Sequence, residues 1–394
     1  MKPLPLTPIH GWLVETRRAL HRIPELGYRE LKTAAFIAEQ LRAFGVDCRS
    51  GVGGTGIVAR IKGRRPGPTL ALRADMDALP LQEQNQVDYR SEHPGVMHAC
   101  GHDGHVTMLL GVIRTLVDEE WYRDAAGSRV FVFQPAEEGG AGARAILDSD
   151  LEELKDVSAY FAVHLHPELP TGHVGLSLRV SNAASDAIKI RLTGKGGHGA
   201  QPHLCVDPIV AGAHLVTALQ TIVSRNVHPL DSVVLTIGRF RAGTASNIIP
   251  QEAVLQGTLR TLDEGVRSKV LARLEDIARG VEASYGPRVK LTVTPGYPLL
   301  VNDEHVVRFA MERARGLLGP ECVHEERPRM GSEDFAYFLQ RAPGALIRLG
   351  CHDPSLGFRY GLHSPCFDMD ERALDVGVLL FLDLLDHYGS QTDS

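Results

Sequence analysis

The sequence predicts an α/β protein with a mixed, largely parallel sheet and one inserted α+β domain. Two observations carry this prediction. Strand-like and helix-like stretches alternate up to about residue 182 and again from about residue 295, as is typical of parallel sheets flanked by helices. Between them the elements follow the order β-α-β-β-α-β, which is the ferredoxin-like order. A chain of 394 residues is long enough for such an arrangement.

The first part of the chain, residues 1–182, contains most of the elements that predict the parallel sheet. Helical spacing is found in "HGWLVETRRALHRIPE" and in "ELKTAAFIAEQLRAFG", where Gly45 ends the helix. The remaining elements alternate: strands "GIVARIKG" and "PTLALRADMDALP", helix "HVTMLLGVIRTLVDEE", strand "SRVFVFQPAEEGG", helix "GARAIL" and strand "VSAYFAVHLHP". We interpret "GVGGTG", Gly51–Gly56, as a turn between strands, because no helix opens after it as a dinucleotide-binding motif requires.

The middle of the chain, residues 183–294, is predicted to form the inserted domain. Its expected strands are "SDAIKIRLTG", "DSVVLTIGRFRAG", "EAVLQGTLRTL" and "RVKLTVTPG". Its expected helices are "DPIVAGAHLVTALQTIVSR" and "GVRSKVLARLEDIARGVEASYG". Residues 295–394 return to α/β patterning, end in the apolar helix "RALDVGVLLFLDLLDHYG", and should complete the domain begun by residues 1–182.

Composition excludes several classes of partner. The formal net charge of −6 provides no basic surface for nucleic acid or for an anionic membrane. No apolar run is long enough to span a membrane, and the first residues do not have the pattern of a signal peptide. The six cysteines show no paired spacing, which in a chain of this length favours reduced thiols and a cytoplasmic location.

Metal-binding side chains gather in "MHACGHDGHVTML". Cys100 and His102 are separated by one glycine, and in an extended segment this spacing directs both side chains the same way, toward one ion. A solvated loop or a helix N-terminus would explain the same residues without a metal. Asp75 and Asp77, in "ALRADMDALP", end a predicted strand, and ligands gather beyond the carboxyl ends of strands in parallel sheets, although such acids also serve as helix N-caps.

Three further clusters lie at predicted strand ends or after a glycine. Glu137 and Glu138 are neighbours, so one carboxylate could bind a metal while the other transfers protons; two solvated turn glutamates are the alternative. His164 and His166 share one face at the end of a predicted strand, and His363 comes after a glycine in "GLHSPCFDMDE". Each cluster is weak evidence singly. Together they place Cys, His, Glu and Asp at several strand ends, which is the layout of a dinuclear hydrolase site.

Nine segments of the sequence resemble the dinuclear-metal amidohydrolases and peptidases that include aminoacylases, hippurate hydrolases and indole-acetyl-amino-acid hydrolases. In order, these segments are "RRALHRIPELGYRE", "LRADMDALP", "MHACGHDGH", "FQPAEEGGAGA", "GKGGHGAQPH", "SNIIP", "GTLRT", "MGSEDFAYF" and "LHSPCFDMDE". The similarity covers nearly the whole chain. The resemblance implies a metallopeptidase-like catalytic domain and an inserted domain that serves as a lid and in dimerisation.

The resemblance also implies roles for individual residues. Cys100 would bridge two divalent ions, with His102 and His164 completing one site and Glu138 and His363 the other. Glu137 would be the general base and acid, and Asp77 would hold a ligand in place. His198, in the inserted domain, would polarise the scissile carbonyl. In the family this histidine often reaches the active site of the partner subunit. The residues implied to bind the substrate carboxylate are Asn247 and Arg260. Four residues are left in supporting positions: Asp75, His98, His105 and His166.

These roles imply a metal-dependent hydrolase that cleaves the amide bond of N-acyl amino acids. The ligand set suits Zn²⁺, Co²⁺ or Ni²⁺. Several members of the family it resembles work with manganese, so we expect two divalent ions per chain, Zn or Mn. A homodimer is expected, with a small-molecule substrate. Two alternatives remain open: a di- or carboxypeptidase with the same metal core, and a catalytically silent relative that binds an amino-acid ligand. The paired glutamates and the complete ligand set argue against a catalytically silent protein. By the resemblance, a cysteine at position 100 favours the acyl-amino-acid branch, because many peptidase branches have an aspartate there.

Overall fold

The computed structural model describes residues 4–357 and 360–388, which form two compact units. The first unit comprises the chain up to Ser181, Val301–Arg327, and the chain from Asp334 onward. The second comprises Asn182–Leu300 and Pro328–Glu333. The second unit thus continues past residue 294, where the sequence placed the end of the insertion, and takes in a short later segment. Gly389, the last residue of the expected C-terminal helix, lies outside the described residues.

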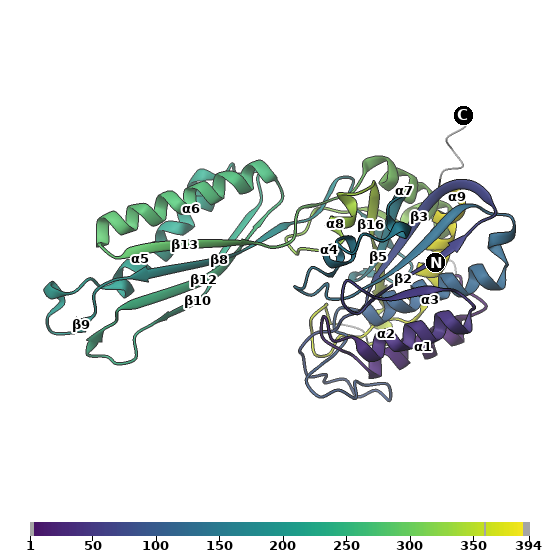
Figure 1. Cartoon of the computed structure of the whole chain (residues 1–394), viewed down its shortest axis with the longest axis horizontal. Helices are drawn as coiled ribbons and strands as arrows, with labels where there is room; N and C mark the ends of the chain where they lie inside the picture. Colours follow the sequence, from purple (N-terminus) through teal and green to yellow (C-terminus); the bar gives the residue numbers. More distant parts are fainter. Residues whose placement is uncertain (1–3, 358–359, 389–394) are drawn as a thin grey trace. The chain divides into compact units, whose positions relative to one another are not determined.

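The first unit is built on an eight-stranded mixed sheet, as the sequence predicted (Figure 1). Its strands lie in the order β1 (Cys48–Val52), β2 (Gly56–Lys62), β4 (Ala126–Gln134), β3 (Arg65–Asp75), β5 (Val157–Pro170), β16 (Gly344–His352), β6 (Val174–Leu176) and β15 (Val323–Glu325). The run β4-β3-β5-β16 is parallel throughout, and β6 pairs with β15 in parallel. The remaining neighbours are antiparallel.

Helices pack on this sheet around one large apolar core. They are α1 (His10–Arg22), α2 (Leu31–Ala43), α3 (His102–Asp118), α7 (Glu304–Leu318) and α9 (Arg372–His387). Two short helices, α4 (Gly142–Leu147) and α8 (Ala336–Leu339), contact each other. Helix α3 is buried along most of its length, against β3, α1 and α9. Gly111 allows this close packing, because a Cβ there would lie 2.7 Å from Cδ2 of Leu13 and 2.8 Å from Cγ2 of Val378.

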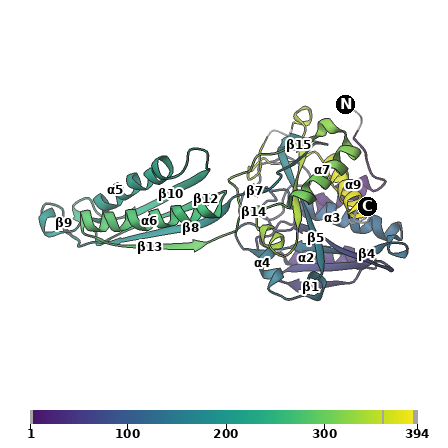
Figure 2. The same cartoon turned by 90° about the horizontal axis from the view of Figure 1, so that it is seen from above.

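The second unit has the predicted β-α-β-β-α-β order. Its elements are β8 (Ala184–Thr193), α5 (Pro208–Thr221), β10 (Val233–Ala242), β12 (Glu252–Thr261), α6 (Glu264–Tyr285) and β13 (Arg288–Pro295). The strands form an antiparallel sheet in the order β10-β12-β8-β13, with α5 and α6 on one face (Figures 1 and 2). The apolar side chains of β8 alternate with exposed ones, so only the helix-covered face forms a core.

Short elements complete the chain. A two-stranded ribbon joins β9 (Gly197–His198) and β11 (Ile248–Ile249), and β7 (Val180–Asn182) and β14 (Leu300–Val301) contain the two main unit boundaries. Single 3₁₀ turns occur at Trp121–Arg123, Glu152–Leu154, Pro202–Leu204, Pro320–Cys322 and Pro354–Leu356, and a π-helical turn, Ile222–Asn226, follows α5. Within the described ranges, no helix combines the length and apolar character needed to cross a bilayer.

Candidate active site

Cys100 and His102 lie at the start of α3. Gly101 between them is left-handed, with φ +81°, and His102 is the first residue of the helix. The expectation of an extended segment was therefore wrong. Glycine suits position 101 because a left-handed φ strains other residues and because a Cβ there would lie 2.8 Å from Cδ1 of Leu165. The turn nevertheless places Sγ of Cys100 and the ring of His102 in one group of neighbouring ligand atoms.

Asp77 holds the turn that carries Glu137 and Glu138. Its carboxylate accepts the backbone N–H of Glu137 through Oδ1 and that of Glu138 through Oδ2, each at 3.0 Å. Its main-chain carbonyl lies 2.9 Å from Nδ1 of His102, so this ring nitrogen donates to it. One residue therefore orients both glutamates and the imidazole.

His164 lies inside β5 and not at its end, because β5 continues to Pro170. The sequence expectation of a strand end was wrong for β5 itself, but the neighbouring strand β3 is shorter. The last β3–β5 pair joins Arg73 and Ala162, so His164 lies beside the carboxyl end of β3. Nδ1 of His164 donates to the carbonyl of Leu165 at 2.8 Å, and Nε2 lies 3.7 Å from Sγ of Cys100.

His363 approaches from the segment before α9. Its φ of +63° is unusual for a residue other than glycine, and its backbone N–H donates to the carbonyl of Ala99 at 2.7 Å. This bond ties His363 to the residue before Cys100. Nε2 of His363 lies 3.3 Å from Oε1 of Glu138, while 55% of the side chain is exposed. This member of the cluster therefore faces solvent.

Among the several groups of neighbouring ligand atoms, two share Cys100 and contain the ligands that the sequence predicted. One group is Cys100, His102 and His164; the other is Cys100, Glu138 and His363, and within each group the ligand atoms lie within 4.8 Å of one another. Two ligands of a tetrahedral zinc ion, each about 2.0–2.3 Å from it, are themselves about 3.3–3.8 Å apart. The Cys100–His164 and Glu138–His363 separations of 3.7 and 3.3 Å fall in this range.

The donor set fits divalent ions. Nε2 of His102 is fully buried and has no hydrogen-bond partner within the described part of the chain, as expected of a nitrogen kept for a ligand. Burial alone would raise the pKa of Cys100, but His102 and His164 lower it to about 7, so the thiolate forms readily. Burial would likewise raise the pKa of Glu138, but His363 and His102 lower it. Glu137, 6% exposed, lies beside this cluster, within 4.8 Å of ligand atoms of His102 and Glu138.

Asp75 and His105 form a buried chain of contacts behind the cluster. Nδ1 of His105 donates to Oδ1 of Asp75 at 2.5 Å, and its Nε2 accepts the N–H of Leu165 at 2.8 Å. Both ring nitrogens are thus engaged, which argues against His105 as a metal ligand. Arg73 continues the chain, with Nη1 2.6 Å from Asp75 and Nη2 3.0 Å from Asp334. The sequence analysis missed Arg73 and Asp334, although a charged residue inside the apolar stretch "LALRAD" was a signal.

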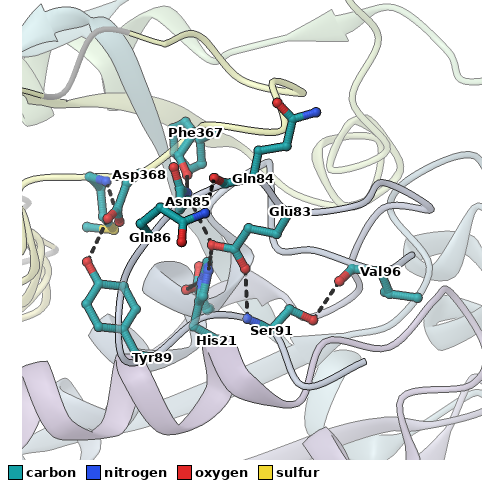
Figure 3. A network of polar contacts seen from close by, with 12 residues as sticks. His21, Glu83, Gln84, Asn85, Gln86, Tyr89, Ser91, Val96, Phe367 and Asp368 are labelled. Carbon is teal, nitrogen blue, oxygen red and sulfur yellow. Dashed lines mark hydrogen bonds and ion pairs between the residues drawn. The ribbon is translucent and has the colours of Figure 1, made fainter. Parts of the chain in front are cut away.

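The loop between β3 and Cys100 is fixed by a network around His21 (Figure 3). Nδ1 of His21 lies 2.8 Å from Asp103, the neighbour of His102, and Nε2 lies 3.3 Å from Glu83. Burial and Arg17 alone would lower the pKa of His21, but Asp103 and Glu83 raise it. Glu83 also accepts the N–H of Ser91 at 2.7 Å, so the network connects α1, the loop and the start of α3.

His98 and His166 are the other two residues expected in supporting positions. His98 is buried, and neither ring nitrogen has a hydrogen-bond partner among the residues that the structure describes. Burial lowers the pKa of His98 to about 3, so the ring is neutral, and nothing in the structure explains its position. His166 lies two residues after His164 on the same face of β5, with Nε2 3.7 Å from Glu168.

The three residues expected to contact substrate from the inserted domain all belong to the second unit. His198 is exposed on β9, and its Nδ1 accepts the N–H of Ala200 at 3.0 Å. Asn247 is exposed, and its carbonyl accepts the N–H of Gly199 at 2.8 Å. Arg260 lies on β12 and donates to Oγ of Ser332 at 2.5 Å. His198 and Asn247 thus come from adjoining segments, whereas Arg260 comes from the four-stranded sheet.

Comparison with known proteins shows the family of the chain. The chain is 39% identical over 376 residues to thermostable carboxypeptidase 2 of Saccharolobus solfataricus, covering 94% of each chain. It is 39% identical over 379 residues to N-acetyldiaminopimelate deacetylase of Exiguobacterium sibiricum, covering 96% of this chain and 98% of the relative. A solved dinuclear metal binding peptidase from the M20 family of Bacillus subtilis is 33% identical, with a TM-score of 0.84 and coverage of 97% and 99%. The model of peptidase family M20/M25/M40 matches residues 71–387, and the chain belongs to this family of hydrolases.

Proposed function

We propose that this protein is a metal-dependent amidohydrolase that cleaves the amide bond of N-acyl amino acids. One observation carries the proposal. Two groups of candidate ligands share Cys100, and a buried carboxylate that neither group requires, that of Glu137, lies directly beside them. A protein that only binds an amino acid needs no such base, so the arrangement favours catalysis over a silent binding role.

The proposed metal centre comprises two divalent ions, Zn or Mn, with Co or Ni also suited to the ligands. Cys100, His102 and His164 would hold one ion, and Cys100, Glu138 and His363 the other. When bound, the ions act as Lewis acids that polarise the amide carbonyl and acidify water. The Nδ1 bonds of His102 and His164 to main-chain carbonyls select the neutral tautomer in which Nε2 is the nitrogen that would bind an ion.

Glu137 would perform both proton transfers. Its carboxylate takes a proton from the attacking water as the water oxygen bonds to the acyl carbon. When the carbon–nitrogen bond breaks, Glu137 returns that proton to the departing amine. Asp77 holds the backbone N–H groups of Glu137 and Glu138, so the base keeps a constant position during both steps.

His198 would donate a hydrogen bond to the developing oxyanion. Because Nδ1 of His198 accepts the N–H of Ala200, the neutral ring carries its proton on Nε2, where it can be donated. We propose that the second unit, which contains His198, serves as a lid and as the contact surface of a homodimer. Asn247 and Arg260 of this unit would bind the substrate carboxylate. Arginine suits that role because its planar fork matches a carboxylate.

Mixed dimers test whether His198 acts across subunits. Homodimers of His198→Ala and of Glu137→Gln should both be nearly inactive. Co-refolded in equal amounts, they should recover about a quarter of wild-type activity, because half the dimers are mixed and each contains one intact site. Activity that stays at background, with mixing verified by native mass spectrometry, would show that His198 acts within its own chain.

The substrate is proposed from relatives and from the site together. The deacetylase relative supports an N-acyl amino acid, and the carboxypeptidase relative keeps a di- or carboxypeptidase as the second candidate. Hippurate-like and indole-acetyl conjugates remain within the first proposal. The six cysteines are all free thiols, which supports a reducing, cytoplasmic compartment.

A hydrolysis panel tests this proposal. N-acetyl, N-benzoyl and N-indoleacetyl amino acids should be cleaved faster than simple dipeptides, each assayed with defined Zn²⁺ or Mn²⁺. Faster cleavage of the dipeptides would favour the peptidase, and no cleavage of any substrate would favour a silent binding protein.

A further inference from the structure

The turn that carries Glu137 and Glu138 begins with a strained residue. Ala136 has φ +51°, in the left-handed region that alanine rarely adopts. Such a conformation persists only where its surroundings impose it. The backbone N–H groups of three successive residues in this turn each bind a carboxylate oxygen. Asp77 binds those of Glu137 and Glu138, and Oε1 of Glu30 binds that of Ala136 at 2.9 Å.

Glu30 is fully buried and both of its oxygens are used. Oε2 accepts the hydroxyl of Thr55 at 2.5 Å, opposite the bond to Ala136. Glu30 precedes α2, but its side chain makes no capping bond to that helix. Glu25 serves the helix instead, since its Oε2 accepts the N–H groups of Lys32 and Thr33 at 2.8 and 3.0 Å. A buried carboxylate is costly, and α2 does not account for Glu30.

The residues just before Glu30 contact the same turn. A Cβ on Gly27 would lie 3.0 Å from both Cα and Cβ of Ala136, so this close approach favours glycine. Tyr28 has φ +61°, and its hydroxyl donates to the carbonyl of Gly140 at 2.7 Å. The segment Gly27–Glu30 therefore contacts the turn at its first residue, Ala136, and again at Gly140. Glu30 and Ala136 are 106 residues apart in the sequence.

We propose that Glu30 is a positioning residue that holds Ala136 in its left-handed conformation and thereby aims Glu137 and Glu138 at the metal cluster. The proposal rests on the proposed role of Glu137 as the base. Without the carboxylate of Glu30, Ala136 can relax to a negative φ, which rotates the peptide that leads into Glu137. A displacement of about 1 Å at a reacting group costs on the order of 100-fold in rate.

Glu30→Met and Glu30→Gln separate positioning from space filling. Methionine keeps the buried volume but lacks the carboxylate, whereas glutamine can still accept from Ala136 and donate to Thr55. We expect Glu30→Met to lower kcat by about 10- to 100-fold with KM changed by less than about threefold. Glu30→Gln should keep kcat within about threefold of wild type. Adding Ala136→Gly to Glu30→Met should recover part of kcat, because glycine adopts a positive φ without strain.

Asp375→Ala is the matched control for stability. Asp375 is a buried carboxylate of the same unit that accepts bonds from the backbone and hydroxyl of Thr7 and from Nδ1 of His10. The Asp375→Ala variant should have a lower Tm but an unchanged kcat when it is assayed well below Tm. If Glu30→Met behaves in the same way, the proposal is overturned. If Glu30→Met does not fold, Thr55→Val decides: kcat lower by about threefold or more supports the proposal, and unchanged kcat overturns it.

Zinc titration supplies a readout that does not depend on catalysis. Because Glu138 lies on the same turn, Glu30→Met should weaken one of the two Zn²⁺ affinities by about tenfold and leave the other unchanged. Unchanged affinities for both ions would count against the proposal. If wild-type protein hydrolyses no substrate, the proposed function fails, while the zinc titration still reports whether Glu30 holds the turn.

Discussion

Replacing Glu137 with glutamine is expected to lower turnover by roughly 1,000-fold or more without changing the metal content. The substitution keeps the size of the side chain and leaves the backbone bond to Asp77 in place. It removes only the ability to take and return a proton, and general acid–base catalysis contributes about 100- to 10,000-fold. Steady-state kinetics with saturating metal, together with metal analysis by mass spectrometry, measures both parts of the prediction.

The neighbouring glutamate provides the matched control. Glu138→Gln is equally conservative, but Glu138 lies among the candidate ligands, 3.3 Å from His363. That variant should lose metal as well as activity, and excess metal should restore part of the activity. The opposite pattern, with Glu137→Gln losing metal and Glu138→Gln keeping it, would exchange the proposed roles. Normal turnover in Glu137→Gln would rule out the mechanism.

Cys100→Ser is expected to have the second large effect, a loss of metal from both sites and of activity with it. Cys100 is common to the two ligand groups, so one substitution weakens both. Its thiol has a pKa of about 7 and readily forms a thiolate, whereas a serine hydroxyl at the same place stays protonated near neutral pH. Metal analysis after dialysis should find fewer than two ions per chain, and two tightly held ions would show that Cys100 is not shared.

Alkylation supports the same test on the unmodified protein. Iodoacetamide should inactivate metal-free protein faster than metal-loaded protein, because bound ions occupy the reactive sulfur. Cys48→Ser is the control, since Cys48 is a partly buried thiol on β1 outside the ligand groups. The Cys48→Ser variant should keep its metal content, and bound metal should still protect it from inactivation by iodoacetamide. Equal rates of inactivation with and without metal would contradict a role for Cys100 as a ligand.

The sequence by itself determined the order and type of most elements up to about residue 294, and the last helix. Apolar side chains with periods of 2 and 3.6 residues reflect which face of a strand or helix is buried, and this information is local. The same local patterns placed the β-α-β-β-α-β segment and indicated a turn in "GVGGTG", of which residues 53–55 connect β1 to β2. Residue types with metal chemistry near strand ends were also visible, because the carboxyl ends of parallel strands meet along one edge.

Local reasoning failed where one segment decides the conformation of another. The left-handed Gly101 starts α3 at His102, and its need for glycine comes partly from Leu165 on β5. His164 lies at the site because β3 ends earlier than β5 does, which only the strand register reveals. Sequence periodicity predicts neither the conformation of Gly101 nor the position of His164. It indicates which residues are buried, but not which residues bury them.

The tertiary structure alone decided how the buried polar groups are used. His105 resembles a ligand in sequence, but its two ring nitrogens are occupied by Asp75 and Leu165. Glu30 resembles an ordinary acid at the start of a helix, yet it binds the backbone of Ala136, beside the proposed base. A buried polar group must find a partner, and that partner can come from any part of the chain. Sequence shows which groups need partners, and only the packed fold determines which partners they receive.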